Sequence, residues 1–218
     1  MAVLSERMVV DEADRLRAQA YTLLAQFLAR PPSRALLDAA GALSGDSSPM
    51  GRALDALGTA ARNPSEDDAE REFNALFIGV VRGELVPYGS YYRAGCLNDR
   101  PLAEVRGDLR VLGFERSPGV AEPEDHIATL CEVMAALVED SGLPAQKRFF
   151  DRHLAPWAGR FFADLERAGA GRLYRPLGTV GRLFMTIETD AFAMLAAPGH
   201  DARQGGYSDD AGREQARA

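Results

Sequence analysis

The sequence predicts an all-α fold, a helical bundle of two lobes joined by a hinge. Apolar residues recur at spacings of three and four along most of the 218 residues, as on one face of a helix. No run alternates apolar and polar residues as a half-buried strand does. We expect an N-terminal lobe over 1–113, a hinge linker over 114–122, a C-terminal lobe over 123–197, and a disordered tail over 198–218, where hydrophobic residues become scarce.

Each helix expected in the first lobe has a recognisable start or stop. The apolar pattern that begins at Asp11 ends at Pro31-Pro32, and Ser33 is typical of the N-cap of a shorter helix. Ser65, followed by three acidic residues, predicts another start, and Gly79 is a typical helix end. The expected elements are helices over 11–30, 33–43, about 53–57 and 65–79, a loop over 79–97, and a helix over 100–112.

The second lobe follows a linker centred on Pro118-Gly119. Pro123 fits the first position of a helix, where a missing N–H costs nothing. Helical stepping from there turns His126 toward an apolar face with Leu130 and Leu137, which favours a hydrogen-bonded core residue over a ligand. Further helices are expected from Pro144 to a break or kink at Pro156, then onward through Trp157 and Phe161, and from about Tyr174 to 195.

Composition limits the classes of partner. A net charge of −7 argues against nucleic acid or an anionic membrane surface and fits a cationic partner better. The N-terminus lacks the apolar core of a signal peptide, and no apolar run approaches the roughly 20 residues that span a bilayer. We therefore expect a cytoplasmic protein without membrane insertion. Cys96 and Cys131 are isolated and are expected to be reduced, structural thiols.

Motifs for catalysis, metal binding or phosphate binding are missing from the sequence. It contains three histidines and no HExxH, so we expect no metal and no cofactor. It also lacks the GxSxG of a nucleophile elbow and both glycine-rich phosphate loops. Acid–base chemistry by Asp125 and His126 stays open as an alternative, and it predicts that His126→Ala abolishes a measurable turnover.

Two stretches carry the functional signal. Residues 122–126 place three carboxylates and one imidazole within about one helical turn, where they could grip a cation or simply begin a helix. Residues 88–92 hold three tyrosines in five positions. Tyrosines on a surface are costly unless they pack on the body of the protein or line a recognition groove.

Taken in order, four segments resemble one known family. They are the sequence EFNALFIG over 72–79, PYGSYY over 87–92, EPEDH over 122–126, and Phe150 with His153-Leu154 and Trp157. This ordered set, over roughly residues 10–195, is similar to the TorD/DmsD family of redox-enzyme maturation chaperones, in the NarJ-like superfamily. Gly89 departs from the family's commoner pattern, and the tail after 198 matches nothing in it.

The resemblance implies a cytoplasmic chaperone without catalytic turnover. Such a protein binds the twin-arginine signal peptide, the catalytic subunit of a molybdenum-cofactor oxidoreductase, or both, and assists cofactor insertion before export. A leader with guanidinium groups followed by an apolar segment needs carboxylates beside a hydrophobic groove. The residues that the resemblance assigns to leader binding are Glu122, Pro123, Glu124, Asp125 and His126, with Tyr88, Ser90, Tyr91 and Tyr92 beside them.

Other possibilities stay open at this point. A NarJ-like relative would assemble a membrane-bound reductase without a separate exported leader. A helical regulatory module would bind an unrelated partner without depending on an arginine pair. The sequence does not identify the client. It does not fix the oligomeric state either, because lobes joined by a hinge can form a monomer or a domain-swapped dimer.

Overall fold

The computed structural model describes residues 12–79, 83–116 and 122–196, and within these ranges the chain is helical and has no strand. The predicted all-α class is confirmed. The expected tail over 198–218 and the centre of the linker lie outside the described residues. The elements are α1 (Glu12–Ala29), α2 (Arg34–Gly41), α3 (Pro49–Ala61), α4 (Glu66–Phe73), the π-helix η1 (Asn74–Ile78), α5 (Gly89–Ala94), α6 (Arg100–Val111), α7 (Ile127–Asp140), α8 (Leu143–His153), α9 (Ala158–Arg167) and α10 (Tyr174–Ala196).

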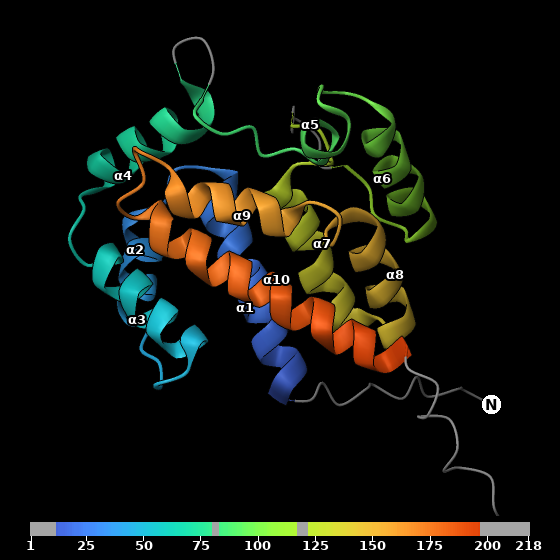
Figure 1. Cartoon of the computed structure of the whole chain (residues 1–218), viewed down its shortest axis with the longest axis horizontal. Helices are drawn as coiled ribbons and strands as arrows, with labels where there is room; N and C mark the ends of the chain where they lie inside the picture. Colours follow the sequence, from blue (N-terminus) through green and yellow to red (C-terminus); the bar gives the residue numbers. More distant parts are fainter. Residues whose placement is uncertain (1–11, 80–82, 117–121, 197–218) are drawn as a thin grey trace, which may run out of the picture.

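The core joins helices from both halves of the chain. Helix α1 packs along α7, and α10 packs against α9 and α3 (Figure 1). The ring of Tyr21 on α1 meets that of Phe184 on α10 edge-on, with 4.7 Å between centroids. A single apolar cluster includes buried residues from α1, α7, α9 and α10. The division into lobes at 114–122 stays a prediction, and the helices on either side of it share this core.

The predicted caps in the first half are present. The Ser33 hydroxyl accepts a hydrogen bond from the Leu36 amide and begins α2. Ser65 and Asp68 form a reciprocal capping box at the start of α4, so two otherwise unpaired amides of that helix end are satisfied. Gly79 ends η1 with a positive φ of 61°, a conformation that glycine adopts without steric cost. These sequence predictions are confirmed.

Three sequence predictions are wrong. The segment over 79–97 is not all loop, because α5 occupies Gly89–Ala94. The helix expected to start at Pro123 begins at Ile127 instead, with His126 as its N-cap. The reason is that residues 123–126 form a turn, in which the His126 amide donates to the Pro123 carbonyl over 3.1 Å. Helix α3 is also longer than predicted, since Ser48 caps a helix that runs over Pro49–Ala61.

A buried ion pair ties α1 to α10. The Arg17 guanidinium donates two hydrogen bonds to the Glu188 carboxylate, over 2.7 Å and 2.9 Å. The Tyr21 hydroxyl donates a third over 2.9 Å, and Glu188 is only 1% exposed. Arg17 also donates to the Gln146 side chain of α8 over 3.0 Å. Because every partner of the carboxylate comes from another helix, this network fixes how α1 and α10 cross.

The sequence predicts packing roles for Trp157 and His153. Trp157 and His153 are buried, and the indole N–H donates to the His153 carbonyl over 2.6 Å, which confirms a packing role. Cys96 is exposed, Cys131 is buried, and both are free thiols.

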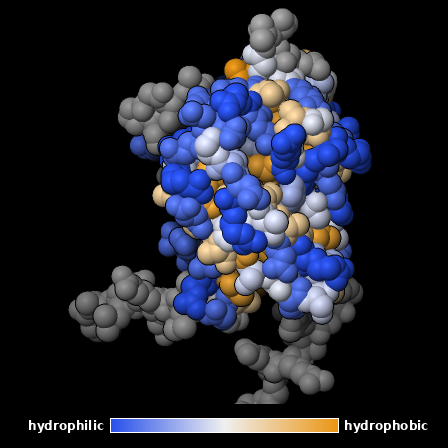
Figure 2. Space-filling view, turned by 90° about the vertical axis from the view of Figure 1, so that its left-hand side faces the viewer, coloured by the Kyte–Doolittle hydropathy of each residue, from blue (hydrophilic) through white to orange (hydrophobic). Residues whose placement is uncertain are grey.

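Figure 2 shows the side on which α2, α3 and α4 lie, where hydrophilic residues surround scattered apolar ones. No helix in the described ranges combines the length and apolarity that a bilayer crossing requires.

Candidate functional site

The two stretches singled out in the sequence meet edge to edge. Tyr88 and His126 form an isolated antiparallel bridge. The Gly89 amide donates to the Asp125 carbonyl over 2.9 Å, and the Ile127 amide donates to the Pro87 carbonyl over 2.9 Å. Segments 35 residues apart along the chain therefore form one backbone unit between α5 and α7.

Asp125 points into the protein. It is 1% exposed, and its Oδ2 accepts a hydrogen bond of 2.7 Å from the Ser90 amide in the first turn of α5. Its Oδ1 and the buried Ser90 hydroxyl have no hydrogen-bond partner among the described residues. A carboxylate in this position holds the start of α5, and it does not reach the surface where a peptide would bind.

His126 is also buried, at 6% exposure, and caps α7. Its Nδ1 accepts a hydrogen bond from the Ala128 amide over 3.1 Å, and its ring meets that of Tyr88 edge-on with 5.0 Å between centroids. Burial lowers the pKa of His126 to about 4, so the imidazole is neutral at pH 7. The hydrogen-bonded core histidine predicted from the sequence is confirmed.

Glu122 and Glu124 differ from Asp125 in facing a cleft. The Tyr88 hydroxyl donates to the Glu122 carboxylate, and partial burial raises the pKa of Glu122. Glu124 lies 2.8 Å from the guanidinium of Arg106 on α6 and 3.7 Å from that of Arg116. Burial alone would raise the pKa of Glu124, but its backbone hydrogen bond and the Arg106 guanidinium outweigh that effect and lower it.

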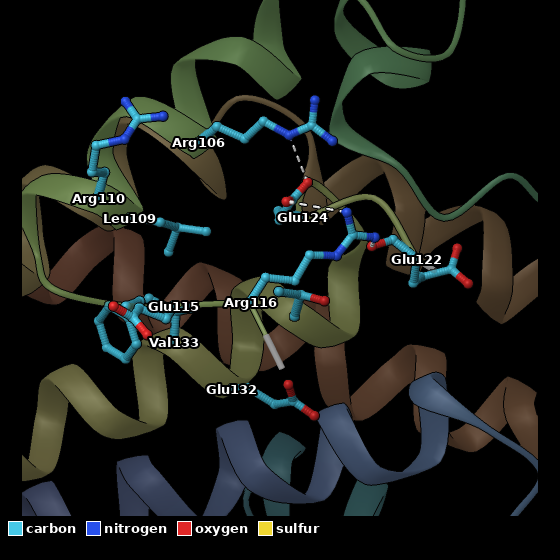
Figure 3. Close-up of a pocket in the computed structure, with 11 residues that line it drawn as sticks. Arg106, Leu109, Arg110, Glu115, Arg116, Glu122, Glu124, Glu132 and Val133 are labelled. Atoms are coloured by element: carbon cyan, nitrogen blue, oxygen red, sulfur yellow. Dashed lines mark hydrogen bonds and ion pairs between the residues drawn. The ribbon is translucent and has the colours of Figure 1, made fainter. Parts of the chain in front are cut away.

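The cleft lies between α6, α7 and the ends of the linker, and has a volume of about 580 Å³ (Figure 3). Its apolar lining comes from Leu109, Phe114 and Val133. Two further carboxylates, those of Glu115 and Glu132, line it as well, and burial raises the pKa of Glu132. The cleft thus combines an apolar surface with carboxylates, which is the chemistry that a cationic, partly apolar segment requires.

The sequence analysis missed most of this lining. The signal was present as helical spacing, because residues three or four apart share one face of a helix. This spacing separates Arg106 from Leu109 on α6, and Thr129 from Val133 on α7. It could not be recognised without knowing that α6 and α7 face each other across the acidic stretch.

The other two tyrosines face a different surface. The Tyr92 hydroxyl donates to Asp164 of α9 over 3.0 Å, and its ring lies 5.4 Å from that of Trp157. Tyr91 and Tyr92 line a second cavity of about 460 Å³, together with Glu84 and Arg160. Tyr88 thus contacts an acidic side chain of the first cleft, and Tyr91 and Tyr92 line the second cavity.

Within the described residues, no group of three or more His, Cys, Asp or Glu side chains is arranged to hold a metal ion. The cleft presents charged side chains and apolar surface. This arrangement defines an all-α protein with a partly apolar cleft, lined by four glutamates and three arginines.

Comparisons with known proteins give the family. The model of the nitrate reductase delta subunit family matches residues 44–163, and the chain belongs to that family. The chaperone protein TorD of Vibrio cholerae serotype O1 is 28% identical over 136 residues, which are 57% of this chain and 62% of that protein. The Tat proofreading chaperone DmsD of Salmonella paratyphi A is 28% identical over 121 residues, 55% of this chain and 59% of that protein.

The matched region thus spans about three fifths of the length of these curated relatives, which are named as chaperones and not as enzymes. A crystal structure from Archaeoglobus fulgidus, described as a redox enzyme maturation protein, shares the fold. It has a TM-score of 0.56 and 17% identity, covering 84% of this chain and 99% of that one. The resemblance to redox-enzyme maturation chaperones is confirmed.

Proposed function

We propose that this protein is a cytoplasmic chaperone that binds the twin-arginine signal peptide, the catalytic subunit, or both, of a molybdenum-cofactor oxidoreductase. It assists insertion of the cofactor before export. Support comes from membership of the nitrate reductase delta subunit family and from relatives named as the TorD chaperone and the Tat proofreading chaperone DmsD. The protein itself carries no cofactor and performs no turnover.

The observation that carries the proposal is the cleft between α6 and α7. A twin-arginine leader presents two guanidinium groups and then an apolar segment. In Figure 3 the carboxylates of Glu122 and Glu124 lie on one side of the cleft, and the side chains of Leu109 and Val133 lie on the other, so the cleft offers a place for each part. Charge-assisted hydrogen bonds from arginine to carboxylate supply the specificity, and apolar burial supplies part of the affinity.

The residues of the two motifs take two roles in this proposal. Glu122 and Glu124, with Pro123 between them, contact the leader, and the Tyr88 hydroxyl orients Glu122. The remaining residues hold the frame: Asp125, His126 and Ser90 join α5 to α7, and Tyr91 and Tyr92 lie at the second cavity.

The test is calorimetry with a synthetic leader peptide that has two adjacent arginines followed by an apolar segment. Loss of one charge-assisted hydrogen bond, worth about 1.5 kcal/mol, should weaken binding of the Glu122→Gln variant about tenfold. Glu139→Gln makes the same charge change at an exposed position elsewhere on α7 and should leave the affinity unchanged. A peptide with both arginines changed to lysine should bind more weakly, because lysine lacks the planar fork.

Equal affinity of the wild-type protein and Glu122→Gln for the arginine peptide would remove Glu122 from the site. No binding of this peptide to the wild-type protein would exclude leader recognition. The family match to the nitrate reductase delta subunit then favours the second candidate, an assembly chaperone that grips the mature catalytic subunit of a membrane-bound reductase. Co-purification with a leaderless catalytic subunit tests that candidate, and size-exclusion chromatography of the same sample separates a monomer from a domain-swapped dimer.

A further inference from the structure

Glu124 already has two arginine partners from this chain. The Arg106 Nε on α6 lies 2.8 Å from its Oε2, and an Arg116 Nη lies 3.7 Å from its Oε1. Arg116 also donates to the Glu122 carbonyl over 2.9 Å. In Figure 3 the Arg116 side chain extends across the cleft toward Glu124, and Arg106 reaches the same carboxylate from the opposite side. A pair of guanidinium groups thus converges on one carboxylate of the cleft.

The other carboxylates of the cleft are arranged differently. Within the described residues, Glu115 and Glu132 form no ion pair, and Glu122 is bonded to a tyrosine hydroxyl and not to a cation. A cationic peptide that enters the cleft therefore meets these three carboxylates without a competing cation. At Glu124 it has to compete with Arg106 and Arg116.

We propose that Arg106 and Arg116 act as internal placeholders, which hold Glu124 in the absence of a client and give it up to the arginine pair of a bound leader. This inference rests on the proposed function, because it takes the leader to be the client of the cleft. It adds that binding is an exchange of one guanidinium pair for another, and that the chain's own arginines lower the affinity.

Arg116 should leave first. Its guanidinium is 3.7 Å from Glu124, against 2.8 Å for Arg106. It is the weaker of two contacts to the same carboxylate, and its other hydrogen bond is to a backbone carbonyl. Competition of this kind reduces the apparent affinity by the fraction of molecules in which Glu124 is free.

The exchange also predicts selectivity for arginine over lysine. A guanidinium can make two parallel hydrogen bonds to a carboxylate, whereas an ammonium is a single point charge. A leader with two arginines replaces the contacts of Arg106 and Arg116 with contacts of the same kind. A leader with two lysines has to displace them and returns fewer hydrogen bonds.

The experiment measures binding of the arginine leader peptide to the full-length protein by calorimetry. Removing a half-exposed ion pair that competes with the ligand should tighten binding, so we expect Arg116→Gln to lower Kd about two- to fivefold. Arg110→Gln is the matched control: Arg110 lines the same cleft but has no ion pair in the described structure and points away from Glu124 in Figure 3. It makes the same change in net charge.

A double variant separates competition from a general charge effect. If Arg116 competes for Glu124, the gain from Arg116→Gln should disappear when Glu124→Gln is already present. An equal gain in both backgrounds, or an equal gain from Arg110→Gln, would overturn the placeholder. If the wild-type protein binds the peptide and Arg116→Gln leaves the affinity unchanged or weakens it, the placeholder role of Arg116 is overturned, but the proposed function is not. No binding by the wild-type protein or any variant would refute the proposed function and the placeholder together.

Discussion

The buried His126 makes a specific prediction about stability and pH. Protonation of this imidazole in the folded protein has to occur beside other buried groups and at the Nδ1 that accepts the hydrogen bond from the Ala128 amide. The pKa of His126 is therefore lowered to about 4, compared with about 6.5 in an unfolded chain. Between these values the unfolded state binds more protons than the folded state, so the free energy of unfolding falls as the pH falls.

The magnitude follows from the two pKa values. Lowering the pH from 7 to 5 should cost about 2 kcal/mol through His126 alone, and the loss should level off below a pH of about 4. The variant His126→Asn isolates this effect, because asparagine is a good N-cap and does not titrate. It loses the ring contact with Tyr88 and should be less stable at pH 7, but its stability should change less with pH.

The assay is urea unfolding of the wild-type protein and of His126→Asn at several pH values between about 4 and 8, a range that includes the pKa of His126 in the folded and the unfolded state. Other titrating groups contribute to both profiles and cancel in their difference. That difference should shrink by about 2 kcal/mol between pH 7 and 5. Two parallel profiles would refute the reasoning, since they would mean that His126 titrates alike in the folded and unfolded states.

Three further predictions concern an ion pair and glycines of the helices. Arg17→Met leaves the Glu188 carboxylate buried without its cation and should lower the free energy of unfolding in urea by about 3 kcal/mol. The double variant Arg17→Met/Glu188→Gln removes the buried charge and should recover part of this loss. No recovery in the double variant would contradict the ion-pair argument. At Gly181 on α10 an added Cβ would overlap the Phe162 ring, so Gly181→Ala should destabilise the protein by about 2 kcal/mol. Gly107→Ala on α6 meets nothing within 4 Å and should stabilise by about 0.5–1 kcal/mol; equal shifts in both glycine variants would show that packing does not decide the outcome.

Local chemistry made much of the fold predictable from the sequence. The capping box of Ser65 and Asp68 and the stop at Gly79 depend on residues within one or two turns, so their signals are complete in a short window. Helix α5 was missed because Pro87 and Gly89 are typical of loops, and the group that begins this helix, Asp125, is 35 residues away. The start of α7 was misplaced because residues 123–126 form a turn, closed by the hydrogen bond from the His126 amide to the Pro123 carbonyl, before the helix begins.

For the candidate site, the sequence predicted that its two motifs lie close together but not how their side chains are oriented. Sequence analysis placed the acidic stretch and the tyrosines in one region, and Tyr88 does meet Glu122 there. It treated Asp125 as a surface carboxylate, whereas the backbone bridge to α5 turns this side chain inward. It also missed Arg106, because an ion pair between α6 and the residue after Pro123 depends on how the helices pack and leaves no periodic pattern.

The backbone bridge between the two motifs has a consequence for local unfolding. Helix α5 has six residues, too few to persist without support, and its first turn depends on hydrogen bonds to Asp125. The start of α5 and the turn before α7 should therefore open together, as one cooperative unit in amide hydrogen exchange. The amides of Gly89, Ser90 and Ile127 would then exchange at a common rate, and a substitution at Asp125 would accelerate all three.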